Sequence, residues 1–290
     1  MGGGEPPARV LRPSPMSRAL AILKDATLHF VAEDGLGISS QMTLAALTSL
    51  FPFLIFVAAL AGFFGSAGLA TEVTRLVFDA WPKAVADPIA REVQSVLTER
   101  SGGLLTLGAV LSLYFSTSAI EAMRTGLNRA YGFKETRSWW LLRAQSIAFM
   151  TLGSVALLAL AFLLVLGPTL FNALVAWQPA FEPLRGFSQI VRVTVASLLL
   201  AAAVAGAHRW LPTGLVRMRD AAPGVIATLC ASVAFSEAFG AYLRDYLSHY
   251  VSTYAGLASV MVALVFLNTL STLFLAGAAL NAAILRARAL

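Results

Sequence analysis

The sequence predicts an all-α polytopic membrane protein of about six transmembrane helices. Of the 290 residues, 58% are hydrophobic and only 12% are charged, and the mean hydropathy is +0.76, so polar groups are too few to cover a soluble protein. Long apolar runs recur from Met42 to the C-terminus, and Lys and Arg are unevenly distributed between the loops that join them. We therefore expect one transmembrane domain, residues 16–290.

The first two segments lie ahead of the apolar runs. Residues 1–15 are rich in Gly and Pro and lack the apolar core of a cleavable signal peptide, so a disordered cytoplasmic tail is expected. Residues 17–31 carry one apolar helical face, as an interfacial amphipathic helix does. The face consists of Leu20, Leu23, Thr27, Leu28 and Val31.

Six apolar stretches are long enough to span a bilayer, whose core needs about 20 residues of helix. They are residues 42–65, 104–123, 146–166, 191–210, 224–242 and 257–280. An even number of spans places both termini on the same side. Between the first two spans, residues 69–100 carry two amphipathic helical patterns separated by prolines, and we expect these helices to lie on the extracytoplasmic face.

The basic residues predict the orientation. Fourteen of the 21 Lys and Arg residues fall on the side that holds both termini, and this side is predicted to be cytoplasmic because positive loops resist translocation. The net charge of +6 could favour nucleic acid, but the basic residues are dispersed among short loops, so no nucleic-acid partner is expected. The expected location is the bacterial inner membrane.

Few residues suit metal or redox chemistry. The single Cys230 lies in an apolar run, which excludes an intrachain disulfide and favours a small packing residue. His29, His208 and His249 lie in different segments without ligand spacing, and His208 and Arg209 are expected to snorkel to the headgroups. We expect no metal, no cofactor and no catalytic residue.

Pro52 is the first exception within a span. It follows Ser49 in the segment Ser-Leu-Phe-Pro and removes one helix hydrogen bond, which predicts a kink. A structural kink and a gate formed by Ser49 and Pro52 both stay open.

The second span ends in an unusually polar segment, residues 116–132. Glu121, Arg124 and Asn128 fall on one helix face, so we expect an ion pair between Glu121 and Arg124 and a hydrogen bond from Asn128 to a neighbouring helix. These three are candidate substrate-pathway residues. The alternative is a helix that emerges into the cytosol with solvated charges.

The last two spans also carry polar residues. Glu237 lies about midway along the fifth span, where a charge is costly. It is predicted to face the interior or water, where it either belongs to the substrate pathway or makes a structural interhelical hydrogen bond. In the sixth span, Asn268, Gly277 and Asn281 are expected to pack helices together.

Three blocks of the sequence resemble the YihY/BrkB family, once called ribonuclease BN-like. The blocks are residues 41–52, residues 116–132 with the core Leu-Asn-Arg-Ala-Tyr, and residues 250–259 together with 277–282. The resemblance runs from about Ala19 to Ile284. It implies an all-helical membrane fold and envelope-related transport, with lipids among the candidate substrates. The chain departs from the family at Ala279, where Glu is common.

Two function classes follow. A transporter or flippase for an anionic, amphipathic, lipid-like substrate is favoured by Pro52, by the polar face of Glu121 and by Glu237. A non-transporting scaffold for envelope assembly is the alternative. A ribonuclease would need clustered metal ligands, which the sequence lacks. Membrane lipids are the expected partners, and homo-oligomerisation stays open.

Overall fold

The computed structural model describes residues 15–63, 112–178, 180, 182, 185–214, 216–254 and 257–289. Within these ranges the regular structure is helical and no strand occurs, which confirms the predicted all-α class there. Residues 1–14 of the predicted tail, the predicted extracytoplasmic helices within 69–100 and residues 104–111 of the predicted second span lie outside the described residues.

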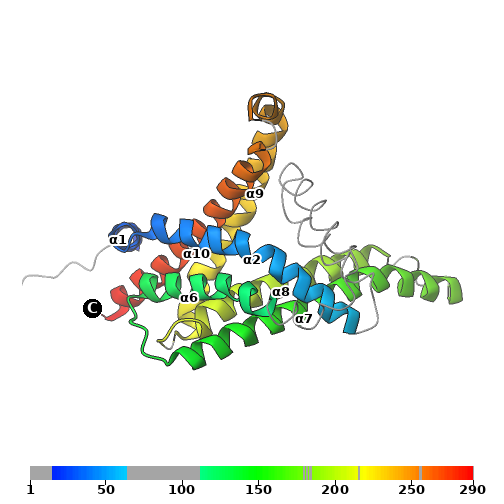
Figure 1. Cartoon of the computed structure of the whole chain (residues 1–290), viewed down its shortest axis with the longest axis horizontal. Helices are drawn as coiled ribbons and strands as arrows, with labels where there is room; N and C mark the ends of the chain where they lie inside the picture. Colours follow the sequence, from blue (N-terminus) through cyan, green and yellow to red (C-terminus); the bar gives the residue numbers. More distant parts are fainter. Residues whose placement is uncertain are drawn as a thin grey trace, which may run out of the picture.

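Seven labelled helices make up the described chain (Figure 1). They are α1 (Pro15–Ala32), α2 (Gly35–Phe63), α6 (Ser118–Tyr131), α7 (Trp139–Trp177), α8 (Arg185–Trp210), α9 (Met218–Tyr254) and α10 (Leu257–Ala289).

Three of these helices contain segments long and apolar enough to cross a bilayer. Among the described residues these segments are Trp139–Leu160 in α7, Met218–Arg244 in α9 and Val260–Arg288 in α10. They overlap the third, fifth and sixth predicted spans. The other three spans and the orientation of the termini stay predictions.

Large apolar side chains on these helices are exposed, which is what lipid rather than water as the solvent would allow. Leu152 of α7 is 69% exposed, and Val233 of α9 is 62% exposed. Trp139 and Trp140 are exposed at the start of α7, and indole rings at a helix end are typical of a membrane interface. These surfaces support a location within a membrane.

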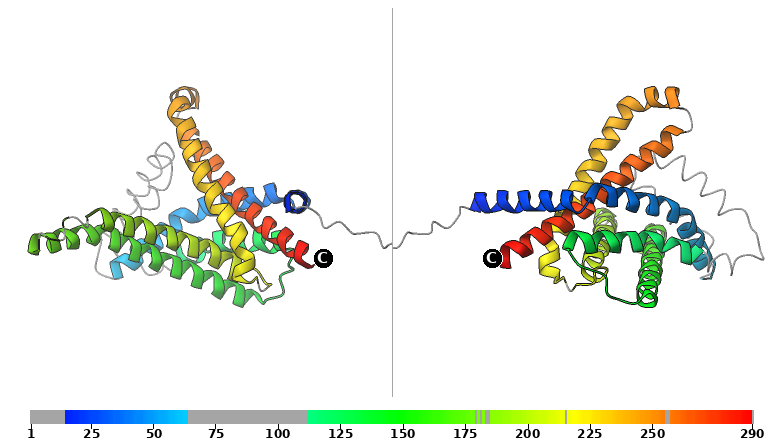
Figure 2. Two further views of the ribbon diagram at one scale, coloured as in Figure 1. Left: turned by 180° about the vertical axis from the view of Figure 1, so that it is seen from behind. Right: turned by 60° about the vertical axis from the view of Figure 1, so that its left-hand side comes forward.

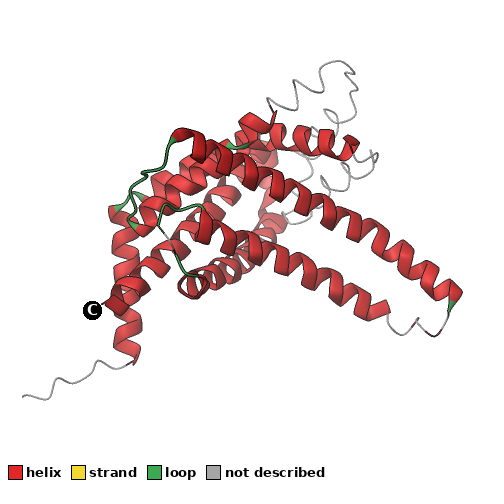
Figure 3. Ribbon diagram, turned by 90° about the horizontal axis from the view of Figure 1, so that it is seen from below, coloured by secondary structure: helices red, strands yellow, loops and turns green. Residues whose placement is uncertain are grey.

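The long helices form two hairpins. Figure 1 shows α9 and α10 rising together, while α7 and α8 run side by side in another direction. The views in Figures 2 and 3 show the same divergence. The hairpins meet α1, α2 and α6 where α7 and α9 begin and where α8 and α10 end. We call this meeting place the junction.

The junction holds the apolar core of the described chain. Leu127 of α6, Leu211 after α8 and Leu275 of α10 are each at most 1% exposed. Gly126 lets α6 lie close to its neighbours, since a Cβ there would lie 2.8 Å from Leu275 Cδ2. The core thus joins segments that are far apart in the sequence.

The start of α6 interrupts the predicted second span. Ser116, Thr117 and Ser118 each donate a hydroxyl hydrogen bond to the carbonyl three residues back, and such bonds compete with regular helix geometry. Residue 117 is a turn, and α6 begins after it. The polar run therefore marks a local irregularity within the predicted second span, at a residue whose backbone keeps right-handed helical angles (φ −73°, ψ −12°).

The end of α6 is fixed by Gly132. This residue has φ 73° and ends the helix in the left-handed region, which glycine adopts without steric cost. The Phe133 backbone N–H donates to the Asn128 carbonyl at 2.7 Å, completing a Schellman-type cap. The chain consequently turns sharply into the connection to α7.

Two glycines allow α9 and α10 to cross closely. A Cβ on Gly224 would collide with the carbonyl oxygen of Gly277, and a Cβ on Gly277 would collide with Thr228 Oγ1. This close approach is the type of contact that small residues permit between membrane helices. The crossing places Asn281 of α10 beside the first turns of α9.

We predict that Gly224→Ala destabilises the protein by about 1–3 kcal/mol, because the added methyl group would push the two backbones apart. Thermal unfolding in detergent measures the effect. Gly240→Ala on the same helix is the matched control, because a Cβ at Gly240 would meet nothing within 4 Å. Equal melting temperatures for the two variants would contradict the close crossing.

Candidate functional site

The junction gathers most of the basic residues that the sequence assigns to the cytoplasmic side. They lie in α6, in the connections that follow α6 and α8, and at the ends of the long helices. The residues are Arg124, Arg129, Lys134, Arg137, Arg143, Arg209, Arg217, Arg219, Arg286 and Arg288. The junction is therefore a strongly basic end of the molecule.

Glu135 and Arg137 form one ion pair in the connection between α6 and α7. Arg137 Nη2 lies 2.9 Å from Glu135 Oε2 and donates to the Leu211 carbonyl at 2.8 Å. The hydrogen bond from Arg137 lowers the pKa of Glu135 to about 2. The pair thus ties the α6–α7 connection to the end of α8.

Glu121 pairs with Arg143 of α7 instead of with Arg124. The Arg143 guanidinium also lies 3.5 Å above the centre of the Tyr114 ring and donates to the Tyr114 carbonyl at 2.9 Å. The expected pair between Glu121 and Arg124 is wrong, because α7 packs against α6 and brings a closer cation to the carboxylate.

Arg124 is buried, with 7% of its surface exposed. Its Nη1 donates to the Leu142 carbonyl at 3.1 Å and to Ser146 Oγ at 2.9 Å. Within the described chain its Nε and Nη2 have no hydrogen-bond partner. Burial lowers the pKa of Arg124 from its ordinary value of 12.5, although a guanidinium stays charged at neutral pH.

The charges around Arg124 do not cancel. Arg137 and Arg143 use the carboxylates of Glu135 and Glu121, and all four groups act electrostatically on Arg124. Three arginines against two glutamates leave one positive charge, and Arg124 is the arginine without a carboxylate of its own. A buried cation with free donors is suited to binding an anion.

Asn128 bridges two connections instead of contacting a neighbouring helix as expected. Its Nδ2 donates to Glu135 Oε2 at 3.0 Å, and its Oδ1 accepts the Thr213 backbone N–H at 2.8 Å. The Schellman-type cap turns the chain back over the end of α6, which brings residues 133–137 within reach of this amide. Asn128 therefore positions the loops that border Arg124.

A second polar network crosses the core. Tyr131 Oη lies 2.8 Å from His208 Nδ1 and accepts a 3.1 Å hydrogen bond from Asn281 Nδ2. Asn281 also donates to the Ala221 carbonyl at 2.9 Å and accepts the Gly224 N–H at 2.6 Å. Burial raises the pKa of Tyr131 to about 12, so its hydroxyl stays protonated at neutral pH.

His208 departs from the snorkelling that the sequence suggested. Its side chain is fully buried, its ring lies 4.9 Å from the Phe274 ring, and its Nε2 has no hydrogen-bond partner in the described chain. The bond with Tyr131 accounts for this burial, because it satisfies one ring nitrogen inside the core.

Comparisons with known proteins place this chain in a family. The family profile described as virulence factor BrkB matches residues 26–289, a range that includes the end of α1 and every helix from α2 to α10. The chain belongs to the BrkB family. This confirms the resemblance seen in the sequence, and with the exposed apolar helices it makes the chain a BrkB family membrane protein.

The BrkB family chain is also similar to the ribonuclease-like protein YfkH of Bacillus subtilis (strain 168). The two are 26% identical over 209 residues, which cover 71% of this chain and 74% of YfkH. No solved structure matches.

The candidate gate of this BrkB protein lies where α2 meets α6. Ser49 Oγ lies 2.6 Å from Ser118 Oγ, and α2 continues as a helix through Pro52, curving along its length in Figure 2. Ser49 therefore connects the segment around Pro52 to the first residue of α6. Its role as a gate stays a prediction.

The candidate packing residues Asn268 and Gly277 contact different helices. Asn268 Nδ2 donates to Ser40 Oγ of α2 at 3.0 Å, while Gly277 lies at the crossing with α9. Thr43 of α2 adds a 3.3 Å hydrogen bond to Ser271. Together with Asn281, these residues place α10 between α2 and α9.

Two residues of α9 lie on its surface. Glu237 is exposed and does not pack between helices. Its carboxylate does not contact Arg124. The Phe235 and Phe239 rings on either side of it stack 5.2 Å apart. Cys230 is exposed as well, which corrects its expected role as a packing residue.

Several residues of this site have no direct signal in the sequence. The side chains of Arg143, Ser146 and Glu135 contact α6. They lie outside α6, so helical spacing within α6 does not predict these contacts. Tyr131 stands within the family-like block, which could have drawn attention to it. The Glu135 and Arg137 pair, two residues apart, could have been recognised as a local ion pair.

We predict that Asn281→Leu lowers the free energy of unfolding by about 2–5 kcal/mol, because it leaves the Gly224 N–H and the Ala221 carbonyl buried without partners. Tyr131→Phe should cost less, since it removes a single hydroxyl. Denaturant titration in detergent micelles compares the two. An Asn281→Leu protein as stable as the unmodified one would refute the network.

We predict that Glu135→Gln is less stable than the unmodified protein at pH 7. The pKa of Glu135 is lowered from 4.5 to about 2 on folding, so its ion pair stabilises the folded state above pH 4.5 and stops doing so as the pH falls towards 2. The difference in melting temperature should shrink over that range. Glu33→Gln, which removes a carboxylate that makes no hydrogen bond in the described chain, is the control for the change in charge and should leave the melting temperature at pH 7 unchanged.

Proposed function

We propose that this protein transports an anionic, amphipathic, lipid-like envelope substrate across the membrane, and that Arg124 binds the anionic group. The observation that carries the proposal is the unbalanced buried charge of Arg124 beside two ion pairs that use the nearby carboxylates. An anion bound there would balance the charge and use the free Nε and Nη2 donors.

The surroundings of Arg124 hold it ready for such a ligand. Hydrogen bonds to Ser146 and to the Leu142 carbonyl fix one side of the guanidinium, so little side-chain freedom is lost when an anion binds. Partial burial reduces competition from water and strengthens the interaction. The substrate's apolar tails would stay in lipid, along the exposed apolar surfaces of the long helices.

Glu237 is the proposed coupling or gating group. An exposed carboxylate within the α9 segment that could span the membrane costs about 2.5–3.5 kcal/mol at the bilayer centre. The cost favours a protonated carboxyl or a water-lined surface at this position. Either condition suits a group that gains and loses a proton during transport.

A non-transporting scaffold for envelope assembly is the second candidate. A cavity between α1, α9 and α10 and a second one beside Gly126 are both lined by residues other than Glu121, Arg124 and Glu237. This separation is what a scaffold with three unconnected polar positions would show. A transport assay distinguishes the two functions, because a scaffold would bind partner proteins and move no lipid.

The name of YfkH raises ribonuclease activity as a further question. Among the described residues, no three His, Cys, Asp or Glu side chains are grouped to hold a metal ion. We propose a non-enzymatic role on the strength of the Arg124 site.

We predict that purified protein in liposomes moves a fluorescent anionic phospholipid between leaflets and that Arg124→Ala slows this movement about tenfold or more, since a charge-assisted hydrogen bond contributes roughly 1.5–3 kcal/mol. Dithionite quenching of the outer leaflet measures the rate. Glu237→Gln should slow it as well, because the amide cannot gain and lose a proton as the proposed coupling carboxyl does.

Arg129→Ala is the matched control, because Arg129 lies exposed on the same helix and its side chain makes no hydrogen bond in the described chain. Ser146→Ala removes one bond to Arg124 and keeps the charge, so an intermediate rate is expected. If the unmodified protein moves no anionic lipid while cells carrying Arg124→Ala and Glu237→Gln keep intact envelopes, the transport proposal fails.

A further inference from the structure

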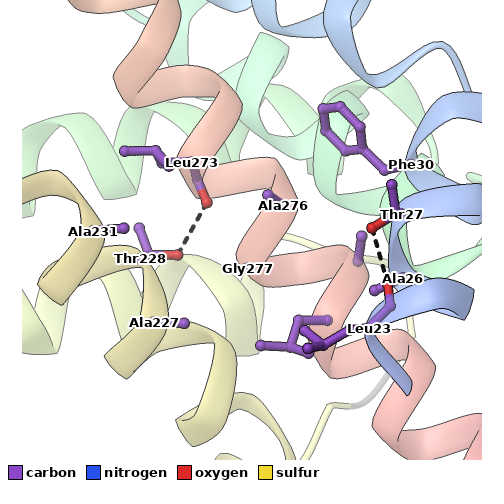
Figure 4. Close-up of a pocket in the computed structure, with 12 residues that line it drawn as sticks. Leu23, Ala26, Thr27, Phe30, Ala227, Thr228, Ala231, Leu273, Ala276 and Gly277 are labelled. Atoms are coloured by element: carbon purple, nitrogen blue, oxygen red, sulfur yellow. Dashed lines mark hydrogen bonds between the residues drawn. The ribbon is translucent and has the colours of Figure 1, made fainter. Parts of the chain in front are cut away.

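A groove of about 350 Å³ lies between α1, α9 and α10 (Figure 4). Leu23, Thr27 and Phe30 of α1 form one wall. Residues of α9 and α10, Ala231 and Ala276 among them, line the remainder. The volume falls within the range of small-molecule sites, and the groove is distinct from the surroundings of Arg124.

The groove arises from the distribution of side-chain sizes. The α9 and α10 residues that face it are mostly Ala and Gly, which permit the close crossing at Gly224 and leave space beside it. The opposite wall, α1, carries larger apolar residues, and Leu23 is 54% exposed. The protein's own side chains thus leave an apolar surface uncovered.

The polar atoms of the groove are already satisfied. Thr27 Oγ1 donates to the Leu23 carbonyl at 2.9 Å, and Thr228 Oγ1 donates to the Leu273 carbonyl at 3.3 Å. Figure 4 shows that the Thr27 bond stays within α1 and that the Thr228 bond runs from α9 to α10. A ligand would therefore meet methyl and methylene groups without a competing hydrogen-bond donor, which favours a hydrocarbon chain.

The charges near the groove are positive and unbalanced. Asp25 of α1 pairs with Arg286 at 2.9 Å, and Asp220 of α9 pairs with Arg288 at 2.6 Å. Lys24 and Arg219, the sequence neighbours of those two acids, are exposed and have no carboxylate partner in the described chain. Around α1, the start of α9 and the end of α10, cations therefore outnumber carboxylates even when Glu33 and Asp34 are counted. The cations are Arg18, Lys24, Arg217, Arg219, Arg286 and Arg288, and the carboxylates are Asp25, Glu33, Asp34 and Asp220.

We infer that this groove binds an acyl chain of an anionic phospholipid, whose phosphate lies near Lys24 and Arg219. Basic residues beside an amphipathic helix attract anionic headgroups, and the groove offers the adjoining apolar site for the chain. The inference stands apart from the proposed transport, because a phospholipid held here would stabilise α1 against the α9–α10 hairpin without passing Arg124.

Photo-crosslinking tests the site. The full-length protein is placed in phosphatidylcholine vesicles that contain a trace of phosphatidylglycerol with a diazirine on one acyl chain, and labelled peptides are identified by mass spectrometry. We expect saturable labelling of peptides from α1 and from the start of α9, competed by unlabelled phosphatidylglycerol and not by further phosphatidylcholine.

Two variants fill the groove, Ala231→Trp and Ala276→Trp, and each should lower the labelling about tenfold. Val233→Trp is the matched control, because Val233 is exposed on α9 and does not line the groove. Lys24→Gln combined with Arg219→Gln should abolish the preference for phosphatidylglycerol over an equally labelled phosphatidylcholine. Gel filtration identifies any variant that fails to fold, and the remaining groove variant then decides.

Labelling that does not saturate, or that Val233→Trp reduces as much as the groove variants do, would show annular lipid only and overturn the inference. Equal labelling of the unmodified protein by phosphatidylglycerol and by phosphatidylcholine would also overturn the inference. Lipid movement by the same liposomes is scored separately. Loss of labelling with unchanged movement supports a bound lipid outside the transport route, whereas intact labelling without movement refutes transport alone.

Discussion

The packing at the junction depends on the side-chain amide of Asn281. This one group donates to the Ala221 carbonyl and to Tyr131, and accepts from the Gly224 backbone. Through Tyr131 it reaches His208, so a single amide relates α10 to α9, α6 and α8. The amide fits only because Gly224 and Gly277 let the backbones approach, and a buried amide without these partners would be costly.

The hydrogen-bonded core around Asn281 and the charged cluster around Arg124 contribute differently to the protein. Around Asn281 nearly every polar group has a partner, which gives rigidity. Around Arg124 the carboxylates belong to Arg137 and Arg143, so the charge is left unbalanced. Asn128 links the two regions, because it lies one turn before the core residue Tyr131 and holds Glu135 in place. The stable network thereby positions Arg124, which is the proposed anion site.

The sequence predicts local properties such as apolar helices well, and it predicts long-range side-chain contacts poorly. Apolar runs locate α7, α9 and α10 because hydropathy is a property of a contiguous segment. The turn at Thr117 was also within reach, since three successive hydroxyl residues compete for backbone carbonyls. The pairing of Glu121 with Arg143 and the burial of His208 were not, because their partners stand 22 and 77 residues away and only the packing of helices decides between the available cations and donors.

The length of α7 adds a mechanical consequence. Its 39 residues extend for about 58 Å, well beyond the roughly 30 Å of a bilayer's hydrocarbon core. Its first turns are hydrogen-bonded to Arg124, and its other end lies far from the junction (Figure 1). A helix fixed at one end acts as a lever arm. A rotation of about 5° at Ser146 would displace the distant end, about 46 Å away, by about 4 Å, so a small adjustment beside Arg124 would be amplified at the far end of α7.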